Sequence, residues 1–184
     1  MAQTFFRRLV GAALLDAETY EEVEADRGAT AQALAVVVCS SLAAGIGAKG
    51  VTGGPATFTF FAGSSVIALL AWAAWALVTF EIGARLLPAP DTHVDVGELL
   101  RTLGFAATPG LIQVLGVLPG AMKPVFVLAA LWTLAATVVA VKQALDYTST
   151  ARALAVCSLG WVLSLVVAAV LGLVFGPTLS GFQN

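Results

Sequence analysis

The sequence has few charged residues. Asp, Glu, Lys and Arg make up 11 % of its 184 residues, whereas soluble domains carry roughly 25 %. The formal net charge is -2, so the chain offers no positive surface of the kind that binds nucleic acid. These shortages exclude an ordinary soluble domain and a nucleic-acid-binding protein.

Histidine and cysteine are also scarce, with one His and two Cys. His93 lies in a loop beside Asp91 and Asp95, which is a weak metal signal, and a solvated loop is the preferred interpretation. Cys39 and Cys157 lie in different apolar segments and have no His nearby, so we interpret them as structural thiols. The chain also has no phosphate-binding glycine loop and no paired acids within an apolar segment. We therefore expect no enzyme activity, no cofactor and no bound metal.

Apolar residues, by contrast, make up 59 % of the chain. A transmembrane helix needs about 20 of them in succession to cross about 30 Å of hydrocarbon. Five segments come near this length: residues 29–48, 58–80, 99–118, 124–141 and 152–175. The prediction is an all-α bundle of five transmembrane helices over residues 29–184, preceded by a short lead-in over residues 1–28.

The lead-in carries apolar residues at helical spacing, at Phe5, Phe6, Leu9, Val10, Ala13, Leu14 and Ala17. This spacing predicts an amphipathic helix that either lies at the membrane interface or packs under the bundle. The apolar stretch is short and runs into acidic residues without a small-residue cleavage site. We therefore do not interpret it as a cleaved signal peptide.

Basic residues are distributed unequally between the two sides of the predicted bundle. Lys49 and Lys123 occupy one side, and the other side has seven basic residues: Arg7, Arg8, Arg27, Arg85, Arg101, Lys142 and Arg152. Lys and Arg accumulate in cytoplasmic loops. We therefore expect a cytoplasmic N-terminus and a non-cytoplasmic C-terminus.

The third segment is irregular. Asp95 and Glu98 have the spacing of a capping box at its start, and Pro109 falls near its middle, where proline breaks the helical hydrogen bonding. The break either is a packing kink or lines a site, as broken helices do in transporters. If this segment re-entered instead of crossing, Lys123 and the C-terminus would move to the cytoplasmic side.

A candidate functional polar layer lies at the predicted cytoplasmic ends of the helices. It consists of Glu81, Arg85, Arg101, Lys142, Asp146 and Arg152. Two pairs in this layer, Glu81 with Arg85 and Lys142 with Asp146, have the four-residue spacing of helical ion pairs. We interpret the layer as interfacial anchors and intramolecular pairs, with a proton or ion path as the alternative. Nearby in the lead-in, the acidic run Glu21, Glu22, Glu24 and Asp26 is either a solvated helix end or a binding site for a cation or a basic partner.

The fifth segment has a small residue at every fourth position. This packing stripe consists of Gly160, Ser164, Ala168, Gly172 and Gly176. Small residues at this spacing let helix backbones approach closely in a membrane. The stripe predicts contact with a shorter alanine ladder in the fourth segment, Ala136, Ala140 and Ala144, and the alternative is a homodimer interface.

Three stretches resemble bacterial members of the Yip (Ypt-interacting protein) family. In residues 99–110, Arg101 leads, Gly104, Phe105 and Ala106 follow, and Pro109 comes after them, as in the third helix of that family. Trp132 and residues 142–153 resemble the junction of its last two helices, and residues 14–26 resemble its lead-in. The resemblance implies a five-helix membrane fold with a cytosolic N-terminus, in this case in a bacterial inner (plasma) membrane.

Eukaryotic members of that family are implicated in vesicle traffic through contacts with Rab-type GTPases and with one another. Those contacts largely involve a long cytosolic N-terminal region, whereas residues 1–28 alone precede the first segment here. The resemblance therefore carries over a membrane fold rather than a catalytic set. It implies the lipid bilayer as a partner, together with protein partners or self-association.

From these observations we predict a non-enzymatic multi-pass membrane protein that organises a membrane or recruits partners at its cytoplasmic face. The alternative is a small transporter or channel for an ion or small molecule. A water-filled cavity reaching Thr108, Gln113 or Thr137 would favour transport, and a tightly packed core would favour the scaffold.

Overall fold

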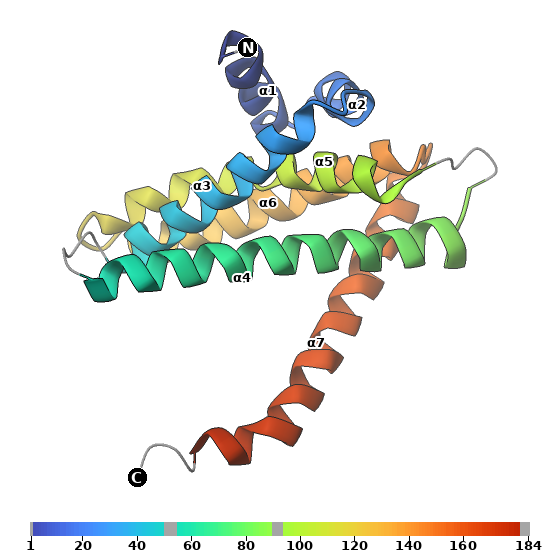
Figure 1. The fold of residues 1–184 in the computed structure, drawn as a ribbon. Coiled ribbons are helices and arrows are strands. Elements are labelled where there is room, and N and C mark those ends of the chain that lie inside the picture. The colour runs from blue at the N-terminus through green and yellow to red at the C-terminus, as the bar shows by residue number, and fades with distance from the viewer. Residues whose placement is uncertain (1, 50–54, 90–93, 181–184) are drawn as a thin grey trace.

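Every element in the described part of the chain is a helix (Figure 1). The computed structural model describes residues 2–49, 55–89 and 94–180, and in α7 it describes side chains for residues 150–163, 165 and 166. The α-helices are α1 (Ala2–Ala13), α2 (Ala17–Ala25), α3 (Ala29–Lys49), α4 (Pro55–Phe80), α5 (Val96–Ala106), α6 (Met122–Ala144) and α7 (Thr150–Ser180). A π-helix, η1 (Glu81–Leu86), continues α4, and a 3₁₀-helix, η2 (Thr108–Val117), follows α5. The all-α prediction is confirmed.

Four stretches of the described chain are long and apolar enough to cross a membrane: Ala29–Ala48, Phe58–Leu86, Val96–Val117 and Met122–Ala144. The described part of α7 adds a shorter apolar stretch, Thr150–Leu163. Figure 1 shows α3 to α6 running side by side, while the second half of α7 leans away from them. The multi-pass architecture predicted from the apolar segments is present in these helices.

Pro109 interrupts the third segment, as its position predicts. The α-helical hydrogen bonding of α5 ends at Ala106, and Pro109 occupies the first turn of η2, where its missing N–H is not needed. The hydroxyl of Thr108 donates to the carbonyl of Phe105 at 2.6 Å, and the backbone N–H of Gly110 donates to Ala107 at 2.9 Å. These bonds satisfy the carbonyls that the break would otherwise leave unpaired inside the bundle.

The lead-in forms two helices where the sequence predicts one. α1 and α2 are joined by a turn at Leu15, whose φ is 62°. Phe5 packs its ring edge-on against Phe105 of α5 at 6.4 Å between centroids, and the indole N–H of Trp132 donates to the carbonyl of Ala13 at 2.7 Å. The lead-in therefore contacts the bundle through Phe5 and Ala13. Phe6 and Val10 of α1 and Leu14 just after it remain exposed.

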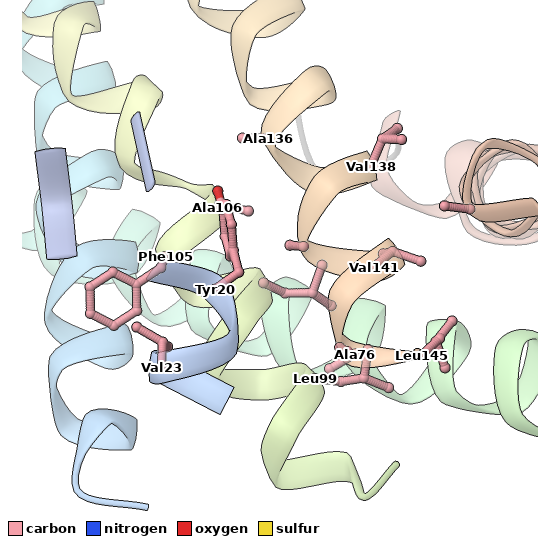
Figure 2. Close-up of a cluster of buried hydrophobic side chains, with 14 of the residues drawn as sticks. Tyr20, Val23, Ala76, Leu99, Phe105, Ala106, Ala136, Val138, Val141 and Leu145 are labelled. Atoms are coloured by element: carbon pink, nitrogen blue, oxygen red, sulfur yellow. The ribbon is translucent and has the colours of Figure 1, made fainter. Parts of the chain in front are cut away.

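The core lies where α2 meets the bundle. Tyr20 and Val23 of α2 are fully buried with Leu99 and Phe105 of α5, and Figure 2 shows them in one cluster with side chains of α6 and with Ala76 of α4. The hydroxyl of Tyr20 donates to the carbonyl of Ala12 at 3.1 Å, so this buried polar group is satisfied. The lead-in therefore packs as part of the folded bundle.

Gly160 marks a close approach between α7 and α4. A Cβ at this glycine would lie 2.8 Å from the ring of Trp75, so the first residue of the predicted packing stripe faces α4. The alanine ladder of α6, Ala136, Ala140 and Ala144, is fully buried. The other stripe residues, Ser164, Ala168, Gly172 and Gly176, lie outside the described side chains.

Replacing Gly160 by leucine is expected to lower the free energy of unfolding in detergent by about 1–3 kcal/mol, because the new side chain must displace Trp75. Gly63→Leu in α4 is the matched control, because a Cβ at Gly63 meets no atom within 4 Å. Thermal unfolding of both variants checks this, and equal midpoints would contradict a packed α4–α7 contact at Gly160.

Candidate functional site

A polar pocket lies between α2, the start of α5 and the end of α6. Its volume is about 470 Å³. The residues that line it are Glu21, Glu24, Ala25, Glu98, Lys142, Gln143, Asp146, Tyr147 and Thr148. Four carboxyl groups and one ammonium group therefore face a common space, which gives the pocket an excess of negative charge.

The ends of two helices position the charged groups of this pocket. At the start of α5, Asp95 accepts from the backbone N–H of Glu98 at 2.9 Å, and Glu98 accepts from that of Asp95 at 2.8 Å, which completes the predicted capping box. At the other helix, α6 ends at Ala144 and Asp146 has a φ of 52°. This left-handed residue turns the chain so that Asp146 and Tyr147 line the pocket.

Arg101 holds the carboxyl end of α2 at the pocket. Its guanidinium is buried and donates from Nε to the carbonyls of Val23 at 3.2 Å and Glu24 at 2.9 Å, and from Nη2 to the same Glu24 carbonyl. A cation at this position satisfies carbonyls that have no partner within the helix and interacts favourably with the helix dipole. Arg101 is therefore a positioning residue for Glu24.

Glu24 has a perturbed acidity. Burial is the largest cause, and the nearby carboxylates of Asp146, Glu98 and Glu21 add to it, so that the pKa of Glu24 is raised to about 7 although Arg101 opposes the change. Gln143 donates to the carboxylate of Glu21 at 2.8 Å. The pocket thus holds a carboxyl group that is partly protonated near neutral pH.

The model of the Yip1 domain family matches residues 13–171 of the chain. The chain belongs to the Yip1 domain family. Neither a curated protein nor a solved structure matches it. All the residues that line the polar pocket lie within the matched part of this Yip1 domain. Together with its apolar helices, the match makes the chain a multi-pass membrane protein.

The six residues of the predicted polar layer fall into separate groups in this Yip1 domain. Lys142 and Asp146 line the pocket, whereas Arg101 binds the backbone of α2 beneath it. Glu81 and Arg85 form an exposed ion pair at 2.9 Å along η1. Arg152 donates to the carbonyl of Pro88 at 3.4 Å and lies over the ring of Tyr147.

Lys142 and Asp146 do not form the helical ion pair that their spacing suggests. The helix ends at Ala144, before Asp146, so the four-residue geometry is lost. Among the described residues, Lys142 makes no ion pair within 4 Å. Lys142 lines the pocket together with the four acidic residues.

The acidic run of the lead-in divides between two places. Glu22 and Asp26 bind Arg8, with nitrogen–oxygen distances of 3.0 and 2.7 Å, and Glu22 also binds Arg7. Hydrogen bonds from Arg7 lower the pKa of Glu22, and a hydrogen bond from Arg8 lowers that of Asp26. Glu21 and Glu24 instead line the pocket. Helical spacing could have predicted this division of the acidic run, because residues 21 and 24 share one face of α2 and residues 22 and 26 share another.

The cysteines lie apart from the polar pocket, Cys39 exposed and Cys157 buried. Across the described ranges, no three His, Cys, Asp or Glu side chains are grouped so that they could hold a metal ion. His93, the weak metal signal of the sequence, lies outside the described residues.

Glu24→Gln is expected to stabilise this Yip1 domain at pH 8 more than at pH 5.5. Since the pKa of Glu24 is higher in the folded state, wild-type stability falls as pH rises from about 4.5 to about 7. The amide removes that loss, which is on the order of 1 kcal/mol after allowing for solvent screening of a half-exposed group. Unfolding curves at both pH values check this, with Glu18→Gln, an exposed position of α2, as the control. Parallel pH dependence in Glu24→Gln and wild type would contradict the assignment.

Proposed function

We propose that this protein is a non-enzymatic, five-span membrane protein that recruits a basic segment of a cytoplasmic partner through the polar pocket. In this proposal α3, α4 with η1, α5 with η2, α6 and α7 each cross the membrane. The N-terminus and the pocket lie in the cytoplasm, and the C-terminus lies on the other side of a bacterial plasma membrane. The unequal distribution of Lys and Arg supports this orientation.

The observation that carries the recruitment role is the charge of the pocket. Glu21, Glu24, Glu98 and Asp146 face a space of about 470 Å³, and Lys142 is the one cation among the residues that line it. The guanidinium or ammonium group of a partner would find several carboxylates within reach there. Charge-assisted hydrogen bonds to carboxylates are about twice as strong as neutral ones.

The lining would make binding of a cation bridge several segments and depend on pH. The carboxylates come from α2, α5 and the connection after α6, so a cation bound among them would join the lead-in to the bundle. Because Glu24 has a pKa of about 7, its charge rises between pH 6 and pH 8, and affinity for a basic segment should rise with it.

The test is binding of a fluorescent hexalysine peptide to the full chain in lipid nanodiscs. Glu24→Gln with Asp146→Asn is expected to weaken binding by about tenfold or more, because two charge-assisted contacts are lost. Glu18→Gln, on an exposed part of α2, is the matched control and should change binding little. Asparagine tolerates the positive φ of Asp146, so the double variant keeps the backbone turn.

Hexaglutamate is the charge-matched negative peptide and should not bind. The recruitment role would be contradicted if hexalysine failed to bind wild type, or if Glu18→Gln weakened it as much as the double variant.

Transport of an ion or small molecule is a second candidate, because a cavity within the bundle reaches Gln113 and Thr137. Thr108 does not line it; its hydroxyl is buried and bonded to Phe105. The uptake of protons or potassium ions by proteoliposomes that contain the protein tests this candidate. A flux above that of empty vesicles would support it, and flux equal to that background would exclude those two ions as cargo.

A further inference from the structure

A second cavity lies inside the bundle, apart from the polar pocket. Its volume is about 590 Å³, and α3, α4, α5, η2, α6 and α7 all contribute to its wall. This volume falls in the range of about 300–1,000 Å³ that is usual for small-molecule sites. None of the residues that line it is Asp, Glu, Lys, Arg or His, so the cavity suits an uncharged group.

The cavity opens at the side of the bundle. Ala71 of α4, Ala130 and Leu134 of α6 and Trp161 of α7 line it and are also exposed. Beyond this opening, Ile67 and Leu70 of α4 and Leu131 of α6 are among the most exposed apolar side chains. The opening is thus continuous with apolar surface on helices that are able to span a membrane.

At one end of the cavity, a polar side chain has no partner. Gln113 lies where η2 packs against the end of α3. A Cβ at Gly47 of α3 would clash with the backbone carbonyl oxygen of Gln113. No donor or acceptor in the described residues pairs with the Gln113 carboxamide. The hydroxyls of Ser40 and Thr137, in contrast, donate to the carbonyls of Ala107 and Thr133 at 2.7 and 2.8 Å. The Gln113 carboxamide is only partly buried, so a ligand or water in the cavity can reach it, and pairing there is favourable in a hydrocarbon environment.

The rest of the cavity is bounded by aromatic rings. Trp75 and Trp161 meet edge to face at 6.2 Å between centroids. The indole N–H of Trp72 donates to the carbonyl of Leu100 at 3.1 Å. Trp72 therefore offers the cavity an apolar ring, and this part of the wall suits methylene groups.

The size of the cavity excludes a helix from a second copy. A helix with its side chains is about 10–12 Å wide. A cylinder of that width filling about 590 Å³ would be roughly 5–8 Å long, or about five residues at most. A single hydrocarbon chain is much narrower and can lie along the same space.

We propose that this cavity binds one acyl chain of a bilayer phospholipid. The ester carbonyl of the lipid accepts a hydrogen bond from Nε2 of Gln113, and the chain extends from there between the indole rings of Trp72, Trp75 and Trp161. The lipid enters through the opening between Ala71 and Ala130. Bound in this way, it fills the space between α4 and α6 that side chains leave empty.

The experiment is native mass spectrometry of the purified full chain with palmitoyl-oleoyl phosphatidylglycerol, at detergent concentrations that remove loosely held lipid. Wild type is expected to retain one lipid. Ala71→Phe, which places a ring in the opening, should lower the bound fraction about tenfold, as for a loss of 1.4 kcal/mol. Ala74→Phe is the matched control, because Ala74 is exposed on the same helix and does not line the cavity. Its bound fraction should equal that of wild type.

The role of Gln113 is tested with an ether-linked analogue of the same lipid, which has no carbonyl. Wild type should prefer the ester lipid over the ether by up to about tenfold, the worth of one hydrogen bond, and Gln113→Leu should abolish the preference. Thermal unfolding in the same detergent shows which variants fold, and Ala130→Phe fills the opening from α6 if Ala71→Phe does not fold. Equal retention by a folded opening variant and Ala74→Phe, or an ester preference that persists in Gln113→Leu, would overturn the proposal.

Discussion

Arg101→Leu is expected to lower the free energy of unfolding by about 2–4 kcal/mol and to release the carboxyl end of α2 from the bundle. The buried guanidinium binds the carbonyls of Val23 and Glu24, and hydrogen bonds to a charged group contribute about 1.5–3 kcal/mol each. Leucine retains apolar bulk but leaves these carbonyls without a donor. Amide hydrogen exchange at residues 20–26 should accelerate, since the helix end is no longer held in place.

Arg85→Leu is the control for Arg101→Leu. Arg85 is also an arginine near a helix end, but its side chain is 66 % exposed and its partner Glu81 is 54 % exposed. Exposed ion pairs contribute about 0–1 kcal/mol, so its loss should be small. If both variants lost equal stability, Arg101 would not hold α2 as described.

Lys142→Glu is the second substitution with a large expected effect. It converts a pocket of four carboxyl groups and one ammonium into a pocket of five carboxyl groups. Like charges that share a site disfavour one another's ionised form. We expect a loss of about 1–2 kcal/mol at pH 8, equivalent to a total shift of about one pKa unit for the new carboxyl group. The loss should shrink at pH 5.5, where the Glu24 carboxyl, with its pKa of about 7, is protonated.

Lys142→Arg is the companion variant. It keeps the positive charge, and both side chains can extend to the polar end of a helix, so folding should be retained. Chemical denaturation at the two pH values separates the variants. Equal stabilities of Lys142→Glu and Lys142→Arg at pH 8 would show that Lys142 does not neutralise the pocket.

Local features of the fold were predictable because they depend on residues close in sequence. The break at Pro109 follows from its missing N–H, and the capping box of Asp95 and Glu98 follows from their spacing. The apolar segment at residues 29–48 agrees with α3, Ala29–Lys49, to one residue. The turn at Leu15 escaped prediction because a leucine with positive φ has no sequence signal of its own.

The candidate site was harder to predict because its parts come from distant segments. The hydropathy pattern predicts how deep in the membrane a charged residue lies, but it does not predict which helix lies beside that residue. Arg101 was expected in one layer with Lys142, yet its partners are carbonyls of α2, 77 and 78 residues earlier in the chain. The acidic run by itself indicates a possible cation site. The docking of α2 on the bundle separates Glu21 and Glu24 from their arginine-bound neighbours.

The proposed recruitment requires the polar pocket to face the cytoplasm, and the sidedness of Thr148 tests this most directly. Thr148 is exposed and lines the pocket, so Thr148→Cys in a chain with Cys39→Ala and Cys157→Ala gives one reactive thiol there. The account predicts that a membrane-impermeant maleimide labels this thiol in inverted membrane vesicles and leaves it unlabelled in intact cells. Labelling from outside intact cells would contradict it.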